Sequence, residues 1–284
     1  MKPSKWLILP AVFFTAFSSI FIRWISAPPL AIAFYRMLFT VILLFPYVFS
    51  KHRNAFLQLN PSQKKLSWLS GGFLAIHFTT WIASLSYTSV AASTVLVSCS
   101  PIAVAFYETT IRRKPLPRRF MQMLLLAIFG TLLIVSDAWN QPSRILGNVL
   151  ALIGGFAMAG YLIIGSEQQQ TIPFWVYVLH VYGASAFILG TLLLFSPAGF
   201  VVPSLEDVGL IFAMTLACSL LGHTVYNWLL RYHGAPLVAM ATLCEPIFAT
   251  LLAFILLRES SSTWTLLGGF FVLVSVNLVL LARE

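Results

Sequence analysis

The sequence is poor in charged residues. Asp, Glu, Lys and Arg make up 9% of the 284 residues, and 59% of the residues are hydrophobic. A soluble globular domain has about 25% charged residues. With so few polar side chains, this chain cannot cover an apolar core with a water-facing surface. The shortage excludes a soluble enzyme, a secreted disulfide-stabilised domain and a disordered tail, and it leaves lipid as the solvent for most of the chain.

Motifs for several kinds of chemistry are also missing. The sequence has no P-loop for ATP, no Cys/His cluster with metal-binding spacing and no Gly-x-Ser-x-Gly elbow. We therefore expect no cofactor, no metal and no enzyme activity. The three cysteines, Cys99, Cys218 and Cys244, all lie within apolar runs, so we interpret them as small buried hydrophobic residues and not as a disulfide framework.

Long apolar runs fill the chain instead. A membrane-spanning helix needs about 20 apolar residues, and Pro and Gly mark the gaps between such runs. The pattern predicts an all-α integral membrane protein with ten transmembrane helices. We place them at 6–25, 29–49, 66–87, 91–111, 118–137, 145–165, 174–196, 206–230, 235–257 and 262–281.

Lys and Arg are distributed unevenly among the connections. With the N-terminus in the cytoplasm, thirteen of the 17 fall on cytoplasmic segments, three near the outer ends, and Arg36 within a helix. The cytoplasmic ones are Lys2, Lys5, Lys51, Arg53, Lys64, Lys65, Arg112, Arg113, Lys114, Arg118, Arg119, Arg231 and Arg283. Cytoplasmic loops of membrane proteins are enriched in Lys and Arg. We therefore expect a multi-pass protein of the inner (plasma) membrane with both termini in the cytoplasm, and no nucleic-acid partner.

An internal repeat connects the two halves. The residues CSPI at 99–102 align with CEPI at 244–247, and upstream, with one residue of slippage, His77 falls opposite His223. Residues 1–140 would form one five-helix repeat and residues 141–284 the other. Because five is odd, the second repeat enters the membrane upside down, which is typical of alternating-access transporters with a site at mid-membrane.

These residues resemble the EamA-type members of the drug/metabolite transporter superfamily. The resemblance covers essentially the whole chain and is best in PPLAIAFYRMLFTVILLFP at 28–46 and in CEPIFATLLAFILLRESSSTWTLLGGFFVLVSVNLVLL at 244–281. It implies ten helices in two repeats and the transport of small organic metabolites. The first repeat departs from the pattern after its fourth helix, where Lys114 stands opposite Glu259 and the nearest acid is Glu108.

Two ionisable residues, Arg36 and Glu245, fall at membrane depth, where an unpaired charge costs at least about 2.5–3.5 kcal/mol. Arg36 could hold an anionic group of a substrate, and Glu245 could take a proton or a cation. Alternatively the two neutralise each other, or Arg36 extends to the outer interface. Glu108, beside Arg112 and Arg113, is interpreted as a solvated partner of these arginines.

Two prolines, Pro101 and Pro246, occupy equivalent positions in the middle of predicted helices. Each removes a backbone N–H and frees the carbonyl four residues earlier, on Val97 and Thr242. In lipid such a carbonyl needs another partner or must line a wet cavity. We expect both helices to kink there, beside a cavity or as a static feature of packing.

Two polar helix faces carry a histidine near mid-membrane. One contains His77 and Trp81, and the other contains His223, Tyr226 and Asn227. Such faces turn away from lipid, so they could line one aqueous path, with the histidines as proton carriers. Alternatively each histidine bonds a neighbouring helix. The predicted substrate site comprises Arg36, His77, Trp81, Tyr161, His223, Tyr226, Asn227 and Glu245.

The sequence therefore favours a secondary transporter, an exporter of an amino acid or similar amphipathic metabolite. Its partners would be this substrate, the lipid bilayer and protons as the candidate coupling ion, although exchange without protons fits equally. It would act as a monomer or homodimer. The alternative is an intramembrane enzyme that acts on a lipid or isoprenoid substrate with His77, His223 and Glu245 as acid–base groups.

Overall fold

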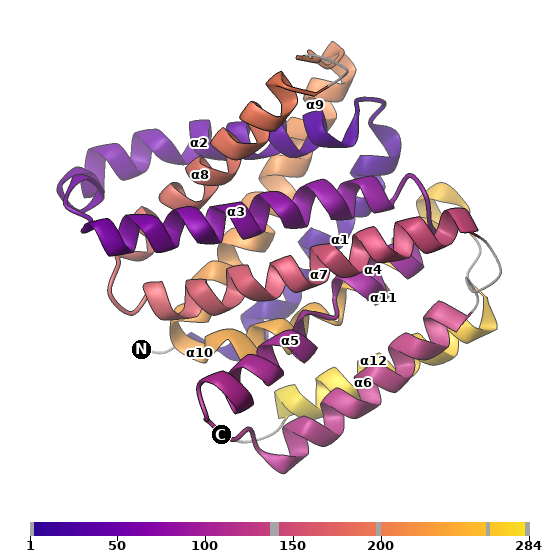
Figure 1. Ribbon diagram of the computed structural model, residues 1–284. Helices are drawn as coiled ribbons and strands as arrows, with labels where there is room; N and C mark the ends of the chain where they lie inside the picture. Colours follow the sequence, from indigo (N-terminus) through magenta and orange to yellow (C-terminus); the bar gives the residue numbers. More distant parts are fainter. Residues whose placement is uncertain (1–2, 137–141, 197–199, 260–261, 282–284) are drawn as a thin grey trace.

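The computed structural model describes residues 3–136, 142–196, 200–259 and 262–281, and these fold almost entirely as helices (Figure 1). In chain order the elements are η1 (Lys5–Leu7), α1 (Ile8–Trp24), α2 (Pro29–Leu57), α3 (Pro61–Ser84), α4 (Val90–Val97), α5 (Ser100–Phe106), η2 (Tyr107–Ile111), α6 (Arg118–Ser136), α7 (Pro142–Gln168), α8 (Phe174–Leu194), α9 (Leu205–Met214), η3 (Thr215–His223), α10 (Thr224–Thr242), α11 (Glu245–Leu257) and α12 (Thr263–Leu281). Elements η2 and η3 are π-helical.

Helix α3 begins earlier than its apolar run does. The Asn60 side chain accepts a hydrogen bond from the Gln63 amide at 2.8 Å, and the Gln63 side chain accepts one from the Asn60 amide at 3.1 Å. This capping box satisfies two backbone groups at the helix start, and Pro61 suits the first helical position. The predicted start at residue 66 is therefore five residues too late, because capping and not hydrophobicity sets this boundary.

The stretch from α9 through α11 is interrupted at Gly234. Its φ of 74° and ψ of 170° are non-helical, and Pro236 follows two residues later. Glycine is favoured where φ is positive because it has no Cβ. The predicted boundary between the helices at 206–230 and 235–257 falls at this residue.

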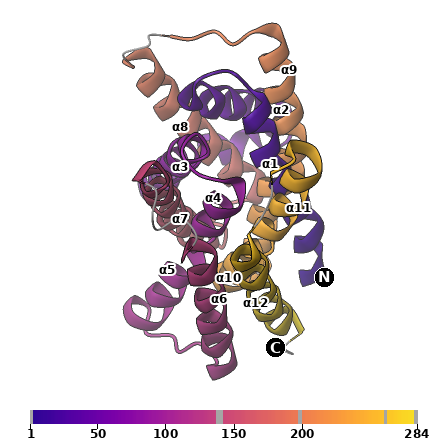
Figure 2. The same cartoon turned by 90° about the vertical axis from the view of Figure 1, so that its right-hand side faces the viewer.

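The two halves of the sequence interleave. Helix α3 packs against α7 and α8, α2 packs against α8, and α1 contacts η3 and α11. Helices α6 and α12 lie side by side at one edge of the molecule (Figures 1 and 2). Contacts between the first and second halves therefore form most of the core.

The outer surface is apolar. Large side chains such as Leu125, Phe187, Phe254 and Phe270 are each 59% or more exposed, as expected where lipid is the solvent. Six described helical stretches are long and apolar enough to cross a membrane: Lys5–Trp24, Pro29–Leu57, Val90–Ile111, Ile145–Gln168, Phe174–Leu194 and Leu205–Leu257. The protein is thus an all-helical, multi-pass membrane protein, and the count of ten spans stays a prediction.

Candidate functional site

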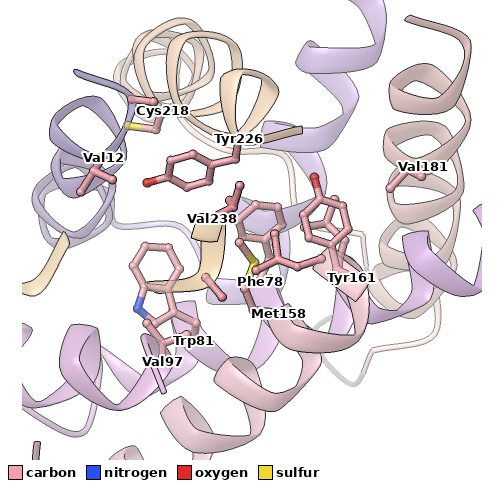
Figure 3. Close-up of a cluster of buried hydrophobic side chains, with 14 of the residues drawn as sticks. Val12, Phe78, Trp81, Val97, Met158, Tyr161, Val181, Cys218, Tyr226 and Val238 are labelled. Atoms are coloured by element: carbon pink, nitrogen blue, oxygen red, sulfur yellow. The ribbon is translucent and has the colours of Figure 1, made fainter. Parts of the chain in front are cut away.

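A small cavity of about 20 Å³ lies where helices of both halves meet. Its lining comes from α3, α4, α7, η3, α10 and α11 and comprises His77, Trp81, Val97, Ser98, Met158, His223, Thr242 and Glu245. Figure 3 shows Trp81, Val97 and Met158 close together in this region. The volume has room for about one water molecule.

Two helix breaks border the cavity. Helix α4 ends at Val97 and α5 begins at Ser100, while α10 ends at Thr242 and α11 begins at Glu245. Each proline therefore lies in the first turn of a new helix, where its missing N–H costs nothing. The predicted kinks are thus full interruptions of the helix.

The breaks are built alike and meet each other. The amide of Cys99 bonds the Leu96 carbonyl at 3.2 Å, and that of Cys244 bonds the Ala241 carbonyl at 3.0 Å. The donor and the acceptor of the second hydrogen bond, Cys244 and Ala241, are each numbered 145 higher than those of the first. The Thr242 carbonyl, freed by Pro246, accepts a long hydrogen bond of 3.4 Å from the Ser98 hydroxyl. The two breaks therefore meet beside the cavity and are joined there by this hydrogen bond.

The two predicted histidines come together here. The His77 and His223 ring centroids are 6.1 Å apart, and the ring of His77 stacks on that of Trp81 at 5.9 Å. His77 Nδ1 also lies 3.0 Å from the Gly154 carbonyl oxygen, so this histidine bonds a neighbouring helix as well as lining the cavity. The role of His77 as a proton carrier stays a prediction.

Two nitrogen atoms of the lining lack a partner. His223 Nδ1 and Trp81 Nε1 are buried and have no hydrogen-bond partner among the described residues. Buried polar atoms are nearly always hydrogen-bonded, and an exception calls for an explanation such as a ligand or water. These two atoms could hydrogen-bond a polar group that enters the cavity.

Glu245 brings a carboxylate to the cavity at the start of α11. It is partly buried, and Thr15 of α1 is a hydrogen-bonding neighbour of its side chain. The Thr15 hydroxyl lies 2.6 Å from the Tyr226 hydroxyl. In Figure 3 the Tyr226 hydroxyl points towards Val12 of α1. Tyr226 therefore supports Glu245 through Thr15 and is not among the residues that line the cavity.

Arg36 lies behind the cavity wall. It is fully buried, its Nε donates to the Ser219 hydroxyl at 2.9 Å, and its guanidinium lies 4.4 Å from the centre of the Phe78 ring. Nη1 and Nη2 have no hydrogen-bond partner among the described residues. Arg36 does not extend to an interface and makes no ion pair with Glu245, although the two charges are electrostatic neighbours.

Asn227 and Tyr161 form a polar cluster beside the site. The Asn227 side-chain amide donates to the hydroxyl of Tyr161, to that of Tyr182 at 3.3 Å and to the His223 carbonyl at 3.0 Å. All three side chains are buried. This network joins α7 and α8 to α10, and Tyr161 is not among the residues that line the cavity.

Sequence reasoning did not assign Met158 or Ser98 to the site, although both line the cavity. The sequence could have indicated Ser98, because this residue lies inside the break that Pro101 predicts. Nothing in the sequence indicates Met158, since a methionine in an apolar helix is normally core. The expected pairing of Glu108 with Arg112 is confirmed at 3.1 Å. Its expected solvation is not, because the residue is only 7% exposed.

The model of the EamA-like transporter family matches residues 3–136 and again residues 145–281. The chain therefore belongs to the EamA-like transporter family, as its sequence motifs suggested, and it is a transport protein of the membrane.

Relatives carry the same description. An uncharacterized transporter of Archaeoglobus fulgidus is 28% identical over 264 residues, which cover 88% of this chain and 87% of that protein. The uncharacterized transporter YwfM of Bacillus subtilis is 25% identical over 70% of this chain and 68% of its own length. A thiamine-repressible mitochondrial transport protein of Saccharomyces cerevisiae, THI74, is 27% identical over 69% of this chain and 57% of its length.

A solved structure has the same fold. A protein of known crystal structure superposes with a TM-score of 0.73 at 14% sequence identity. The superposition covers 97% of this chain and 95% of the other chain. At this identity the likeness extends to the fold alone.

Proposed function

We propose that the protein is a secondary transporter that exports a small organic metabolite, an amino acid or a similar amphipathic compound, across the inner membrane by alternating access. The observation that carries the proposal is the cavity between the two helix breaks of this apolar bundle, which is lined by ionisable and polar side chains. Such groups are costly in lipid and mark substrate and ion pathways. Interrupted helices that meet at mid-membrane are a common way to build such a site.

Several equivalences support two inverted five-helix repeats. The family model matches the chain twice. Helices α5 and α11 begin at Ser100 and Glu245, which differ by 145 in number, and so do Cys99 and Cys244, which precede them. Ten spans result if α4, α5 and η2 form one span and if Gly234 separates two others, and they place both termini in the cytoplasm. Helices α6 and α12, which contribute no residue to the cavity lining, would brace the periphery.

In this proposal Glu245 is the coupling group. Its carboxylate faces the cavity, where it can release a proton to one side of the membrane and take one from the other as access alternates. His223 and Trp81 offer unpartnered nitrogen atoms to the substrate. The buried charge of Arg36 stabilises the ionised carboxylate through space, because screening is weak in the protein interior. Exchange of two substrates without protons needs the same groups apart from the titration of Glu245.

The test starts from metabolite pools in cells that overproduce the protein and in cells that lack it. A compound whose external level rises with the protein is then offered to proteoliposomes with and without an imposed proton gradient. The proposal expects flux well above that of protein-free liposomes. If no candidate compound crosses faster than in protein-free liposomes, the proposal is wrong.

A further inference from the structure

Two ion pairs join the first half of the chain to the second half. Arg23, near the end of α1, lies 3.8 Å from Glu259, which follows α11. Arg112, which follows η2, lies 3.6 Å from Glu167, near the end of α7. In each pair one partner is the penultimate residue of a helix, Arg23 in α1 and Glu167 in α7.

The segments that carry the other partners are built alike. Arg113 and Arg258 both have a φ of 54°, and they are the described non-glycine residues with positive φ. Their numbers differ by 145. Next to each, a backbone hydrogen bond closes the helix end, from Lys114 N to Glu108 O at 2.8 Å and from Glu259 N to Ala253 O at 3.2 Å. The residue numbers of the two donors differ by 145, and so do those of the two acceptors.

A left-handed residue after a helix, with a backbone bond that runs back to it, is a standard C-terminal cap. Arg112 directly precedes one such residue and Glu259 directly follows the other. Helices α1 and α7 are the first helices of the two proposed repeats, so the two ion pairs are made from equivalent helix ends. The charges are exchanged, because α1 contributes Arg23 to its pair and α7 contributes Glu167.

The pairs lie at opposite ends of the bundle. Helix α7 links them, since Asn148 near its start hydrogen-bonds Thr88, whose carbonyl accepts from Arg23, and Glu167 lies near its end. Nineteen residues separate Asn148 from Glu167, about 28 Å along a helix, which is one membrane thickness. Met158, which lines the central cavity, lies about midway.

Each pair also holds further groups. Glu259 Oε1 accepts a hydrogen bond from the Val90 amide at the start of α4, at 3.0 Å. At the other end, Glu167 accepts from the Tyr107 hydroxyl at 3.0 Å. Beside that second pair is a cavity of about 350 Å³ that is lined by polar and charged residues, among them Glu108, Arg112 and Glu167.

From this geometry we infer that Arg23–Glu259 and Arg112–Glu167 are two latches, one per membrane face, and that the central cavity opens to a face only when the latch at that face separates. The inference rests on the proposed alternating access. The side chains are 27–40% exposed, and ion pairs that solvent reaches are weak, so a latch can open and close repeatedly. In the proposed orientation Arg23–Glu259 closes the outer face and Arg112–Glu167 the cytoplasmic face.

Access to the cavity can be measured without a substrate. The reporter is Ser98→Cys in a chain whose native cysteines carry Cys99→Ala, Cys218→Ala and Cys244→Ala. A membrane-impermeant maleimide is applied to right-side-out and to inside-out vesicles. We expect Arg23→Gln to raise the labelling rate from the outer face about threefold or more and not from the inner face. Arg112→Gln should do the reverse, so each variant is the matched control of the other.

Charge exchange tests the pairing itself. Arg23→Glu should open the outer face, and Arg23→Glu with Glu259→Arg should return labelling to the starting rate. Arg112→Glu and its double variant with Glu167→Arg should behave likewise at the inner face. Size-exclusion profiles in detergent identify charge-exchange variants that fail to fold. Where one does, the result with Arg23→Gln or Arg112→Gln at the same face is used in its place.

The inference is overturned if both Gln variants alter labelling at the same face, if neither alters it, or if Ser98→Cys stays unlabelled from both faces in every variant. The result is independent of the transport assignment. Side-specific labelling without any metabolite flux would retain the latches and reject the proposed substrate class. Flux with unchanged labelling would reject the latches alone.

Discussion

The imidazole rings of His77 and His223 lie 6.1 Å apart, although the two residues are 146 positions apart in the chain. Each comes from a polar helix face, and together they form one wall of the central cavity. His77 is held by the Gly154 carbonyl at 3.0 Å, whereas His223 Nδ1 has no partner in the described part of the chain. The pair thus consists of one fixed and one available imidazole.

His223 is predicted to contact the substrate. We expect His223→Phe to lower flux at least tenfold, because it removes the ring nitrogens yet keeps an aromatic ring of similar size. A lost hydrogen bond to a charged group costs about 1.5–3 kcal/mol, or about tenfold and more. The control is His180→Phe, since His180 bonds the Val176 carbonyl of its own helix and packs on Phe56. Equal losses of flux in both variants would show that the position of His223 is not special.

Glu245 is predicted to couple transport to protons. With Glu245→Gln we expect accumulation driven by a proton gradient to be abolished, because the amide cannot titrate, while substrate exchange continues. Proteoliposomes with and without the gradient measure both activities. Glu206→Gln, an exposed glutamate at the start of α9, should leave both unchanged. Gradient-driven accumulation that survives Glu245→Gln would remove this residue from the coupling role.

Arg36 is predicted to serve function at the expense of stability. Its charge is fully buried, and two of its nitrogens have no partner within the described ranges. Desolvation of such a charge costs several kcal/mol, and an apolar side chain of similar volume often removes that cost. We expect Arg36→Met to unfold at the same or a higher temperature in detergent, with flux strongly reduced.

Arg53→Met is the matched control for Arg36, because Arg53 also lies over a ring, that of Phe49 at 5.1 Å, but is exposed. Arg53→Met should change neither the unfolding temperature nor the flux. A lower unfolding temperature of Arg36→Met would assign Arg36 a purely structural role.

Gly155 is predicted to set the distance between α7 and the first helix break. A Cβ at this position would lie 2.7 Å from the Val97 carbonyl oxygen and 3.0 Å from that of Leu96. Overpacking of this kind costs about 1–3 kcal/mol, so we expect Gly155→Ala to lower the unfolding temperature and the flux. Gly183→Ala, whose Cβ would meet nothing within 4 Å, should lower neither. The idea fails if the two variants are equally stable and equally active.

The helix breaks illustrate what could be predicted from sequence. Pro101 and Pro246 stand in equal surroundings within apolar runs, and a proline must interrupt the hydrogen-bond ladder wherever it falls. Local chemistry was therefore sufficient to locate the breaks, and the residues whose carbonyls the prolines free, Val97 and Thr242, both line the cavity. The boundary at Gly234 followed from composition in the same way.

The positions of Arg36 and Tyr226 could not be obtained in this way. Helical periodicity places Tyr226 on the same face as His223, yet its hydroxyl turns to Thr15 of another helix. The sequence left three surroundings open for Arg36: a substrate anion, Glu245 or the outer interface. In the structure its guanidinium lies over the Phe78 ring and its Nε bonds the Ser219 hydroxyl. Which side chain reaches a cavity depends on how neighbouring helices pack, and that information lies in residues far away in the chain.

The sequence by itself determined that this chain lies in a membrane, that it belongs to a transporter family and where its helices break, because hydrophobicity, repeated motifs and proline act locally. Only the tertiary structure decided which ionisable groups share the cavity and which oppositely charged helix ends meet. Arg23 and Glu259 are 236 positions apart, and their contact depends on the packing of α1 against α11. Packing of this kind is a property of the whole bundle, since each helix face can be buried against several partners.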